Sequence, residues 1–419
     1  MREQKYLAIL LVILFINVVA LGQEAEQAKT GEADRAQLED LRARGSQALL
    51  NLDYEGAQQK FLEIRRLYPD HPAGPMLLAS SLWLQKLNAA RRLQASLYNT
   101  KNFYAKSEDK IDPRDAERFL ELIRQTIMFA KARLKTNPRD TEALYYLGAA
   151  EGLKAAFEGT VQRSFMSALR NGSSSVEHHR QVLKLDPTFR DAELTIGIYD
   201  YITGSLPFPV KLMASIVGVR GSKKRGIATL ERVAKEGRGA RDNAKIVLIA
   251  LYKREKRFAD AVKLARELSA QYPRNYLFKI EAADALIAQA MLERKSTEPQ
   301  PTGPTVSERE ALDIFESLLK DREAVRAHDL VRFRYGEALL LAGQPEPAAK
   351  EFLAAANTTG AEAGLATMAH LRAAQALDIL GKRQEAVTEY QAVLNRPNVY
   401  DMHDEARRGL REPYRKPEK

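Results

Sequence analysis

The sequence predicts an all-α solenoid built from about seven to eight helix pairs. A small residue is followed four positions later by an aromatic, as at Ala57 and Phe61, and Pro69 follows eight positions further on. In a pair of antiparallel helices, the small residue lets the backbones approach, the aromatic fills the gap, and the proline ends the second helix. The first half of this pattern returns, 37 and 38 residues apart, at Ala311/Phe315, Ala348/Phe352 and Ala386/Tyr390.

The repeated unit resembles the tetratricopeptide repeat, which has about 34 residues, the same small-to-aromatic spacing and a late proline. The first unit matches from Gly45 to Pro69, and the C-terminal pair of units matches over 333–353 and 371–394. The middle units are degenerate, and an unrelated helical bundle is the alternative. The resemblance implies a helix-turn-helix solenoid whose first helices line an extended surface that binds a protein or peptide.

The N-terminus has the pattern of a secretory signal. Arg2 and Lys5 precede an apolar run over 6–16, and Ala20 and Gly22 supply small residues for a signal peptidase. We therefore expect a signal peptide over 1–22 and export to the periplasm or the outer membrane. The alternative is an uncleaved anchor, although the run is short for a membrane span.

Composition limits the classes of partner. The chain has 65 basic and 55 acidic residues, a net charge of +10, and no cysteine. The charges are intermixed, which is typical of solvated helix faces, and export argues against a nucleic-acid partner. Without cysteine the protein is neither a lipoprotein nor stabilised by disulfides, so its stability must come from its core.

Helices are predicted where apolar residues recur at helical spacing between prolines. Residues 23–34 are polar and are expected to be disordered. Pro69 ends the first pair, Pro113 breaks a long apolar stripe, and Pro138 and Pro187 bound the third pair. The helices expected in this half are 35–50, 54–68, 72 to about 97, 114–135, 141 to beyond 157, and about 173–185.

The fourth unit carries the most distinctive insert, over 205–219, which begins with Leu-Pro-Phe-Pro. A helix from Ser222 follows. The block 199–237 resembles one found in the eukaryotic tetratricopeptide repeat protein 39 and inclusion-body-clearance outer-membrane-protein-like family, with its Leu-Pro-rich segment, glycine turn and Gly-Leu-rich helix. That resemblance implies an adaptor-like helical protein.

The insert and the basic cluster after it allow two interpretations. Apolar residues beside basic ones are typical of segments that dip into an anionic membrane surface. The alternative, which we favour because the stripe is short, is an insert folded back over the edge of the solenoid. The membrane-surface candidates are Met213, Ile216, Lys223, Lys224 and Arg225.

The C-terminal part continues the helix pairs. Helices are expected at 240–254, 258–271, 276–293, 307–319 and 401–410, in addition to the pairs within 333–353 and 371–394. Residues 295–306 are rich in Pro and Thr and are expected to be flexible. They either separate an N-terminal solenoid, 35–294, from C-terminal repeats, 307–396, or form an insert within one repeat. The second is favoured, since otherwise two helices lose their partners.

Two further expectations concern helix ends in this part. Ser307 and Glu310 are predicted to form a capping box at the start of their helix. Residues 397–419 are predicted to form a capping helix and a basic tail, which would close the solenoid.

No residue pattern indicates catalysis, and the predicted protein is not an enzyme. Phosphate-binding, dinucleotide-binding and zinc-protease motifs are absent from the sequence, and the six histidines are scattered. Ser317 and Lys320 have the spacing of a serine–lysine pair but lack its companion motifs. No catalytic, cofactor-binding or metal-binding residue is predicted.

The register of the repeats predicts the side chains that face a partner, because first helices line the binding surface. Aromatics and arginines dominate interface energetics. The alternative is that the aromatics pack between helices. The predicted partner-binding residues are Trp83, Tyr145, Tyr201, Arg334, Glu337, Arg372 and Gln375.

The sequence therefore predicts a non-enzymatic scaffold of the bacterial cell envelope that holds a protein or peptide partner in its groove. The alternative is a membrane-surface or lipid-associated protein that acts through residues 205–225.

Overall fold

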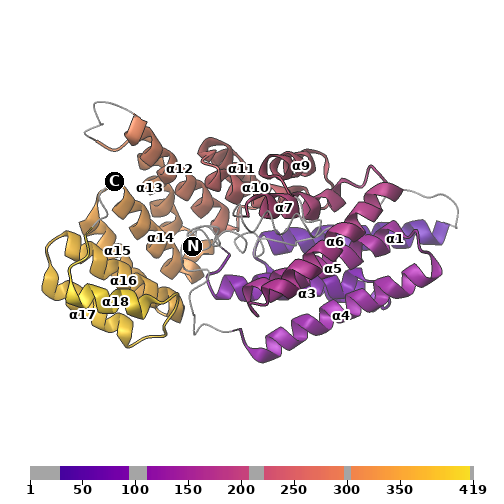
Figure 1. Ribbon diagram of the computed structural model, residues 1–419, viewed down its shortest axis with the longest axis horizontal. Helices are drawn as coiled ribbons and strands as arrows, with labels where there is room; N and C mark the ends of the chain where they lie inside the picture. The colour runs from indigo at the N-terminus through magenta and orange to yellow at the C-terminus, as the bar shows by residue number, and fades with distance from the viewer. Residues whose placement is uncertain (1–28, 94–110, 207–220, 297–302, 416–419) are drawn as a thin grey trace. The chain divides into compact units, whose positions relative to one another are not determined.

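The computed structural model describes residues 29–93, 111–206, 221–296 and 303–415. Within these ranges the secondary structure consists of α-helices and short 3-10 turns, with no strand (Figure 1). The chain divides into two compact units: unit 1 holds the residues up to Leu87 and from 111 to Leu251, and unit 2 holds the others. The predicted all-α class is confirmed.

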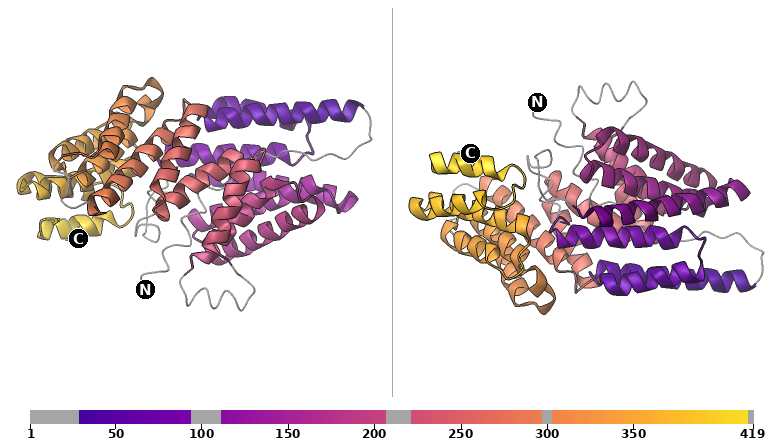
Figure 2. Two further views of the ribbon diagram at one scale, coloured as in Figure 1. Left: turned by 90° about the horizontal axis from the view of Figure 1, so that it is seen from above. Right: turned by 90° about the horizontal axis from the view of Figure 1, so that it is seen from below.

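Unit 1 is a stack of helices, several of which pack side by side with the next helix along the chain, as α1 does with α2, α5 does with α6 and α7 does with α9 (Figure 2). Its elements are α1 (Lys29–Leu50), α2 (Tyr54–Leu67), α3 (Ala73–Ala89), α4 (Pro113–Thr136), α5 (Thr141–Thr160), α6 (Phe165–Leu185), η4 (Arg190–Ala192), α7 (Glu193–Gly204), α9 (Lys223–Glu236) and most of α10 (Arg241–Arg254).

Short polar side chains fix where these helices begin. The carboxylates of Asp53 and Asp140 each accept a hydrogen bond at 2.9 Å from the backbone N–H three residues later. The hydroxyl of Ser222 caps α9 in the same way. Such caps satisfy backbone donors that lack a partner within the helix and make the starting residue predictable.

Three helix ends differ from the sequence prediction. Helix α1 already begins at Lys29, inside the segment expected to be disordered, and the Tyr68 hydroxyl holds its first turns by donating to the carbonyl oxygen of Asp34 at 2.7 Å. Helix α6 begins at Phe165, earlier than expected, and α3 ends at Ala89, short of residue 97. The start of α1 thus involves a tertiary contact that apolar spacing does not report.

Helices α7 and α9 cross at glycines. An ideal Cβ on Gly226 would lie 2.6 Å from the carbonyl oxygen of Gly197, and one on Gly197 would lie 2.9 Å from the Leu230 side chain. Only glycine permits so close a backbone approach. The glycine pattern of the block 199–237 therefore has a packing role.

Helices α5 and α6 are joined by a buried histidine. His179 is 1% exposed, and its Nε2 lies 3.2 Å from the carbonyl oxygen of Tyr145, so Nε2 carries the proton and donates it. Its Nδ1 is buried, and no group in the described part of the chain bonds to it. Burial lowers the pKa of His179 to about 4.

This histidine should make unit 1 sensitive to mild acid. The folded pKa lies below the unfolded value of about 6.5, so the unfolded state binds more protons between these values and stability falls as pH decreases through that window. Within this window, the free energy of unfolding should fall by about 1.4 kcal/mol for each unit by which the pH is lowered. The measurement is urea unfolding at pH values from 6.5 to 4.5. His179→Gln should remove this contribution to the dependence of the free energy of unfolding on pH. His178→Gln, on the adjacent half-buried histidine that contacts Glu151 at 2.8 Å, should retain it.

Unit 2 repeats the helix-pair arrangement. Its first helices α12, α14 and α16 contact one another as well as the second helices beside them, which is the packing of a tetratricopeptide-like solenoid. Its elements are α11 (Phe258–Gln271), α12 (Tyr276–Ser296), α13 (Val306–Lys320), η5 (Arg322–Ala327), α14 (His328–Leu341), α15 (Pro345–Ala356), α16 (Ala363–Ile379), α17 (Arg383–Leu394) and α18 (Met402–Arg411).

Helices α12 and α13 pack against each other as the two helices of one pair, which is the arrangement expected of an insert between them. The predicted capping box is wrong by two residues, because Thr305 and Glu308 form it instead of Ser307 and Glu310. Arg294 on α12 favours this position of the capping box, because its guanidinium binds the fully buried Glu308 carboxylate at 2.6 Å.

The last helix closes unit 2, and Figure 2 shows α16, α17 and α18 next to one another. The buried Asp378 carboxylate accepts hydrogen bonds from the Tyr390 hydroxyl at 2.9 Å and from the backbone N–H of Tyr414 at 2.7 Å. Arg383 pairs with the same carboxylate at 3.0 Å. The chain after α18 is thereby tied to α16 and α17.

Candidate functional site

The predicted aromatic anchors lie inside the helix stack. Trp83 is 3% exposed, and its ring centroid lies 5.6 Å from that of Phe119 and 5.3 Å from that of Phe157. Tyr145 and Tyr201 have no exposed surface. Their assignment to a partner-facing groove is corrected, because large aromatic rings gain more free energy by filling the space between helices than they do in water.

The four predicted polar residues of unit 2 come together. The Arg334 guanidinium donates to Glu337 at 2.9 Å, and Glu337 accepts from Arg372 at 2.9 Å. Arg372 also donates to the amide oxygen of Gln375 at 2.8 Å. The prediction that these side chains share one face of the first helices is consistent with this geometry, while their binding of a partner stays a prediction.

The structure extends this row with three residues that the sequence reasoning missed. Lys253 on α10 contacts Glu281 at 2.6 Å and Asp284 at 3.5 Å, and Asp284 accepts from Arg334 at 2.6 Å. We call the row from Lys253 through Arg372 the charge ladder. It runs across α10, α12, α14 and α16.

A sequence signal for the ladder exists in retrospect. Each of the three first helices contributes two polar residues three positions apart, which places them on one helix face. The missed pair on α12 has the same spacing as the predicted pairs on α14 and α16. The three pairs are Glu281/Asp284, Arg334/Glu337 and Arg372/Gln375.

The ladder is buried at one end and partly open at the other. The side chains of Lys253 and Asp284 are 8% and 7% exposed, whereas those of Glu337 and Arg372 are 24% and 28% exposed. Burial alone would lower the pKa of Lys253, but attraction by Glu281 and Asp284 raises it above its ordinary value. Lys253 therefore carries its charge at neutral pH, and each ion pair of the ladder fixes the rotamers of the side chains that it joins.

The basic cluster forms the first turn of α9, and two of its three side chains contact α7. Arg225 donates to the buried Asp200 carboxylate at 2.7 Å, and the Lys223 ammonium lies 5.8 Å from the centre of the Tyr201 ring. Lys224 is exposed. Met213 and Ile216 fall outside the described residues.

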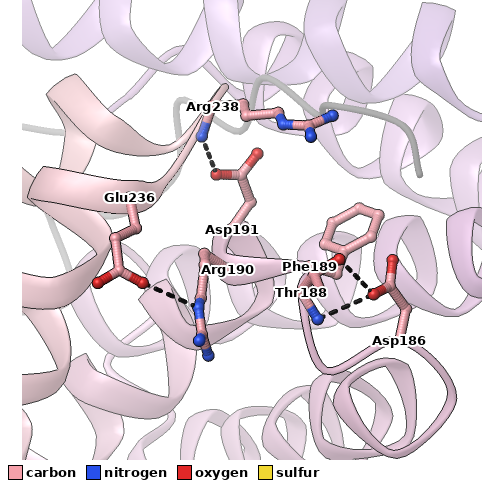
Figure 3. A pocket seen from close by; sticks show the side chains of 7 residues that line it. All are labelled: Asp186, Thr188, Phe189, Arg190, Asp191, Glu236 and Arg238. Atoms are coloured by element: carbon pink, nitrogen blue, oxygen red, sulfur yellow. Dashed lines mark hydrogen bonds and ion pairs between the residues drawn. The ribbon is translucent and has the colours of Figure 1, made fainter.

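A small pocket beside η4 has a structural role (Figure 3). Its volume of 20 Å3 has room for about one water molecule. The Asp191 carboxylate accepts from the backbone N–H groups of Arg238, Gly239 and Ala240 at 2.9–3.1 Å, and Arg190 donates to Glu236 at 3.1 Å. This carboxylate holds the turn that leads into α10.

The described residues offer neither a membrane span nor a cluster of metal ligands. No helix there is both long and apolar enough to span a bilayer. Nor does the described part of the chain bring together three His, Cys, Asp or Glu side chains as a metal ion would need.

No family model matches the chain, and neither does any curated protein. Among solved structures, the human IFIT1 dimer with m7Gppp-AAAA is similar at 12% identity and a TM-score of 0.45, over 98% of this chain and 88% of that one. A tetratricopeptide repeat protein from Parabacteroides merdae is similar at 12% identity and a TM-score of 0.32, over 80% and 99%. Yeast Tom70 is similar at 12% identity and a TM-score of 0.37, over 90% and 72%. The fold assignment therefore rests on this chain's own helix pairs.

Proposed function

We propose that the protein is a non-enzymatic scaffold of the bacterial cell envelope that binds a protein or peptide partner on the first-helix face of unit 2. The observation that carries the proposal is the partly exposed Glu337–Arg372 pair at the open end of the charge ladder. Its rotamers are already fixed by ion pairs, so a partner that binds there loses little side-chain entropy.

The envelope location is supported by the sequence of residues 1–22, whose basic, apolar and small-residue segments follow the order of a secretory signal. The resemblance of block 199–237 to the tetratricopeptide repeat protein 39 and inclusion-body-clearance family supports an adaptor role in the same way. The membrane-surface alternative has less support, because Lys223 and Arg225 contact α7.

Arg372→Ala should weaken partner binding by about 2 kcal/mol, or roughly thirtyfold in Kd, as truncation of an interface anchor does. The measurement is affinity capture from a nuclease-treated envelope extract, followed by titration of the captured protein. The matched control is Arg407→Ala on α18, a 59% exposed arginine paired with Asp404, which should bind as the wild type does.

Equal capture by the wild type and a folded Arg372→Ala variant would refute this assignment of the face. Capture from an untreated extract that is lost after nuclease treatment would refute a protein partner. The N-terminal peptide of the recovered protein reports location: cleavage after Gly22 is expected, and an intact Met1 would contradict it.

A further inference from the structure

The two buried cations of the charge ladder each contact two carboxylates. Lys253 contacts Glu281 at 2.6 Å and Asp284 at 3.5 Å. Arg334 contacts Asp284 at 2.6 Å and Glu337 at 2.9 Å. The side chains of Lys253 and Arg334 are only 8% and 9% exposed, and charges buried to that degree need such pairing. The ladder therefore alternates in sign along its length.

Arg372, the cation at the open end, is less fully paired. Glu337 is the one carboxylate that contacts it among the described residues, and Glu337 also accepts a hydrogen bond from Arg334. The Nε and Nη1 atoms of Arg372 donate to Glu337 and to the amide oxygen of Gln375. Its third nitrogen, Nη2, has no hydrogen-bond partner in the described part of the chain. The alternation thus ends on a positive charge that shares its one carboxylate.

A second donor lies one helical turn away on α16. Because a guanidinium can only donate, the amide oxygen of Gln375 faces Arg372, and its Nε2 is left without a partner among the described residues. Neither Nε2 of Gln375 nor Nη2 of Arg372 is among the buried atoms that lack a partner in these residues, so both nitrogens are accessible to solvent. The open end of the ladder therefore offers two N–H donor groups to an acceptor from outside.

These donors are held in place and lie below the surface. Two hydrogen bonds fix the Arg372 guanidinium, which also lies 5.9 Å from the centre of the buried Phe352 ring. The side chain of Arg372 is 28% exposed, and Gln375 is 6% exposed. A carboxylate carried on a side chain can reach this depth while its backbone stays outside. A C-terminal carboxylate would have to bring the backbone in with it.

We propose that an acidic side chain of the partner binds Arg372 Nη2 and Gln375 Nε2, which continues the alternation of charge in the ladder. A carboxylate matches these donors, because its two oxygens accept hydrogen bonds from a guanidinium and from an amide at once. A basic side chain would instead meet the positive charge of Arg372. This binding mode rests on the proposed function, because it uses the same face, and it adds the chemical class of the partner group.

The test is a titration of the full chain with three short peptides, observed by NMR at the Nε–H signals of ¹⁵N-labelled arginine. Acetyl-Ala-Glu-Ala-amide carries a side-chain carboxylate, acetyl-Ala-Gln-Ala-amide is its neutral counterpart, and acetyl-Ala-Ala-Ala with a free C-terminus carries a terminal carboxylate. The glutamate peptide should shift the Arg372 signal and bind at least about tenfold more tightly than either of the others. Loss of the signal in Arg372→Lys identifies it.

Two substitutions by glutamate make the test specific. Gln375→Glu supplies a carboxylate beside Arg372 from within the chain, so it should abolish the preference for the glutamate peptide. Gln384→Glu is the matched control, because it adds the same charge to unit 2 on the exposed first turn of α17, and it should leave the preference unchanged.

Equal binding of the glutamate and glutamine peptides overturns the proposal, as does tighter binding of the free C-terminus. A folded Gln375→Glu variant that keeps the wild-type preference also overturns it. If that variant loses its helical circular dichroism, Gln375→Ala decides. It removes one donor and should weaken binding of the glutamate peptide about two- to tenfold, and unchanged affinity overturns the proposal.

The peptide titration and the envelope capture can fail separately. Capture that depends on Arg372, without a preference for the glutamate peptide, would keep the proposed function and overturn the acidic side chain as its ligand. A preference for the glutamate peptide at Arg372, without capture of any partner, would support the carboxylate site and refute the proposed function.

Discussion

Gly226→Ala should lower the free energy of unfolding of unit 1 by about 3 kcal/mol, at the upper end of what overpacking costs. The added methyl group would lie 2.6 Å from the carbonyl oxygen of Gly197 and 2.7 Å from the backbone nitrogen of Tyr201. Both atoms belong to backbone, so no rotamer change relieves the clash. Helices α7 and α9 must move apart, and the free energy that this costs exceeds the gain of up to about 1 kcal/mol from replacing a helical glycine by alanine.

Gly172→Ala is the matched control, because this glycine lies in α6 of the same unit and a Cβ added to it would meet nothing within 4 Å. It should stabilise unit 1 by about 0.5–1 kcal/mol, whereas Gly226→Ala destabilises it. Urea unfolding followed by circular dichroism measures both variants. Equal effects of the two substitutions would show that α7 and α9 do not cross at Gly226.

Trp83→Ala should cost about 3–5 kcal/mol, as removal of a large buried aromatic does. The indole packs against Phe119 of α4 and Phe157 of α5, whose rings also stack on each other with centroids 4.7 Å apart. Its loss leaves a cavity between three helices. Trp83→Phe should cost only about 1 kcal/mol, because it keeps the ring contacts and removes an indole N–H that has no hydrogen-bond partner in the described residues.

Denaturant titrations followed by circular dichroism at 222 nm measure these two variants. Met128→Ala, at a 56% exposed position on α4, is the control and should change stability by less than about 0.5 kcal/mol. If Trp83→Ala kept wild-type stability and lost partner binding, Trp83 would belong to the recognition surface after all.

The sequence predicted those parts of the fold that local spacing controls. Apolar periodicity and the positions of prolines located the helices, because both act within a few turns of one helix. The repeat register also placed Arg334, Glu337, Arg372 and Gln375 on one face, since equivalent positions of neighbouring pairs lie side by side in a solenoid.

The remainder depended on contacts between distant residues. Spacing shows that Trp83 lies on a helix but not how that helix is rotated against its neighbours, and an aromatic suits a core as well as an interface. The pairing of Arg225 with Asp200 spans 25 residues. The open cleft lined by Asp34, Glu142 and Thr188 is formed by the ends of helices that are far apart in the sequence, and no motif joins these residues.

The charge ladder has a consequence for how unit 2 loses its structure. In a linear stack, each helix pair touches mainly its neighbours, so terminal pairs ordinarily fray independently of the middle. Detaching α16 from this stack would remove Arg372 from Glu337, and detaching α14 would remove Arg334 from the buried Asp284 carboxylate. Because a buried charge stripped of its partner is strongly unfavourable, such partial openings are suppressed. Amide protons along α12, α14 and α16 should then exchange with solvent as one cooperative block.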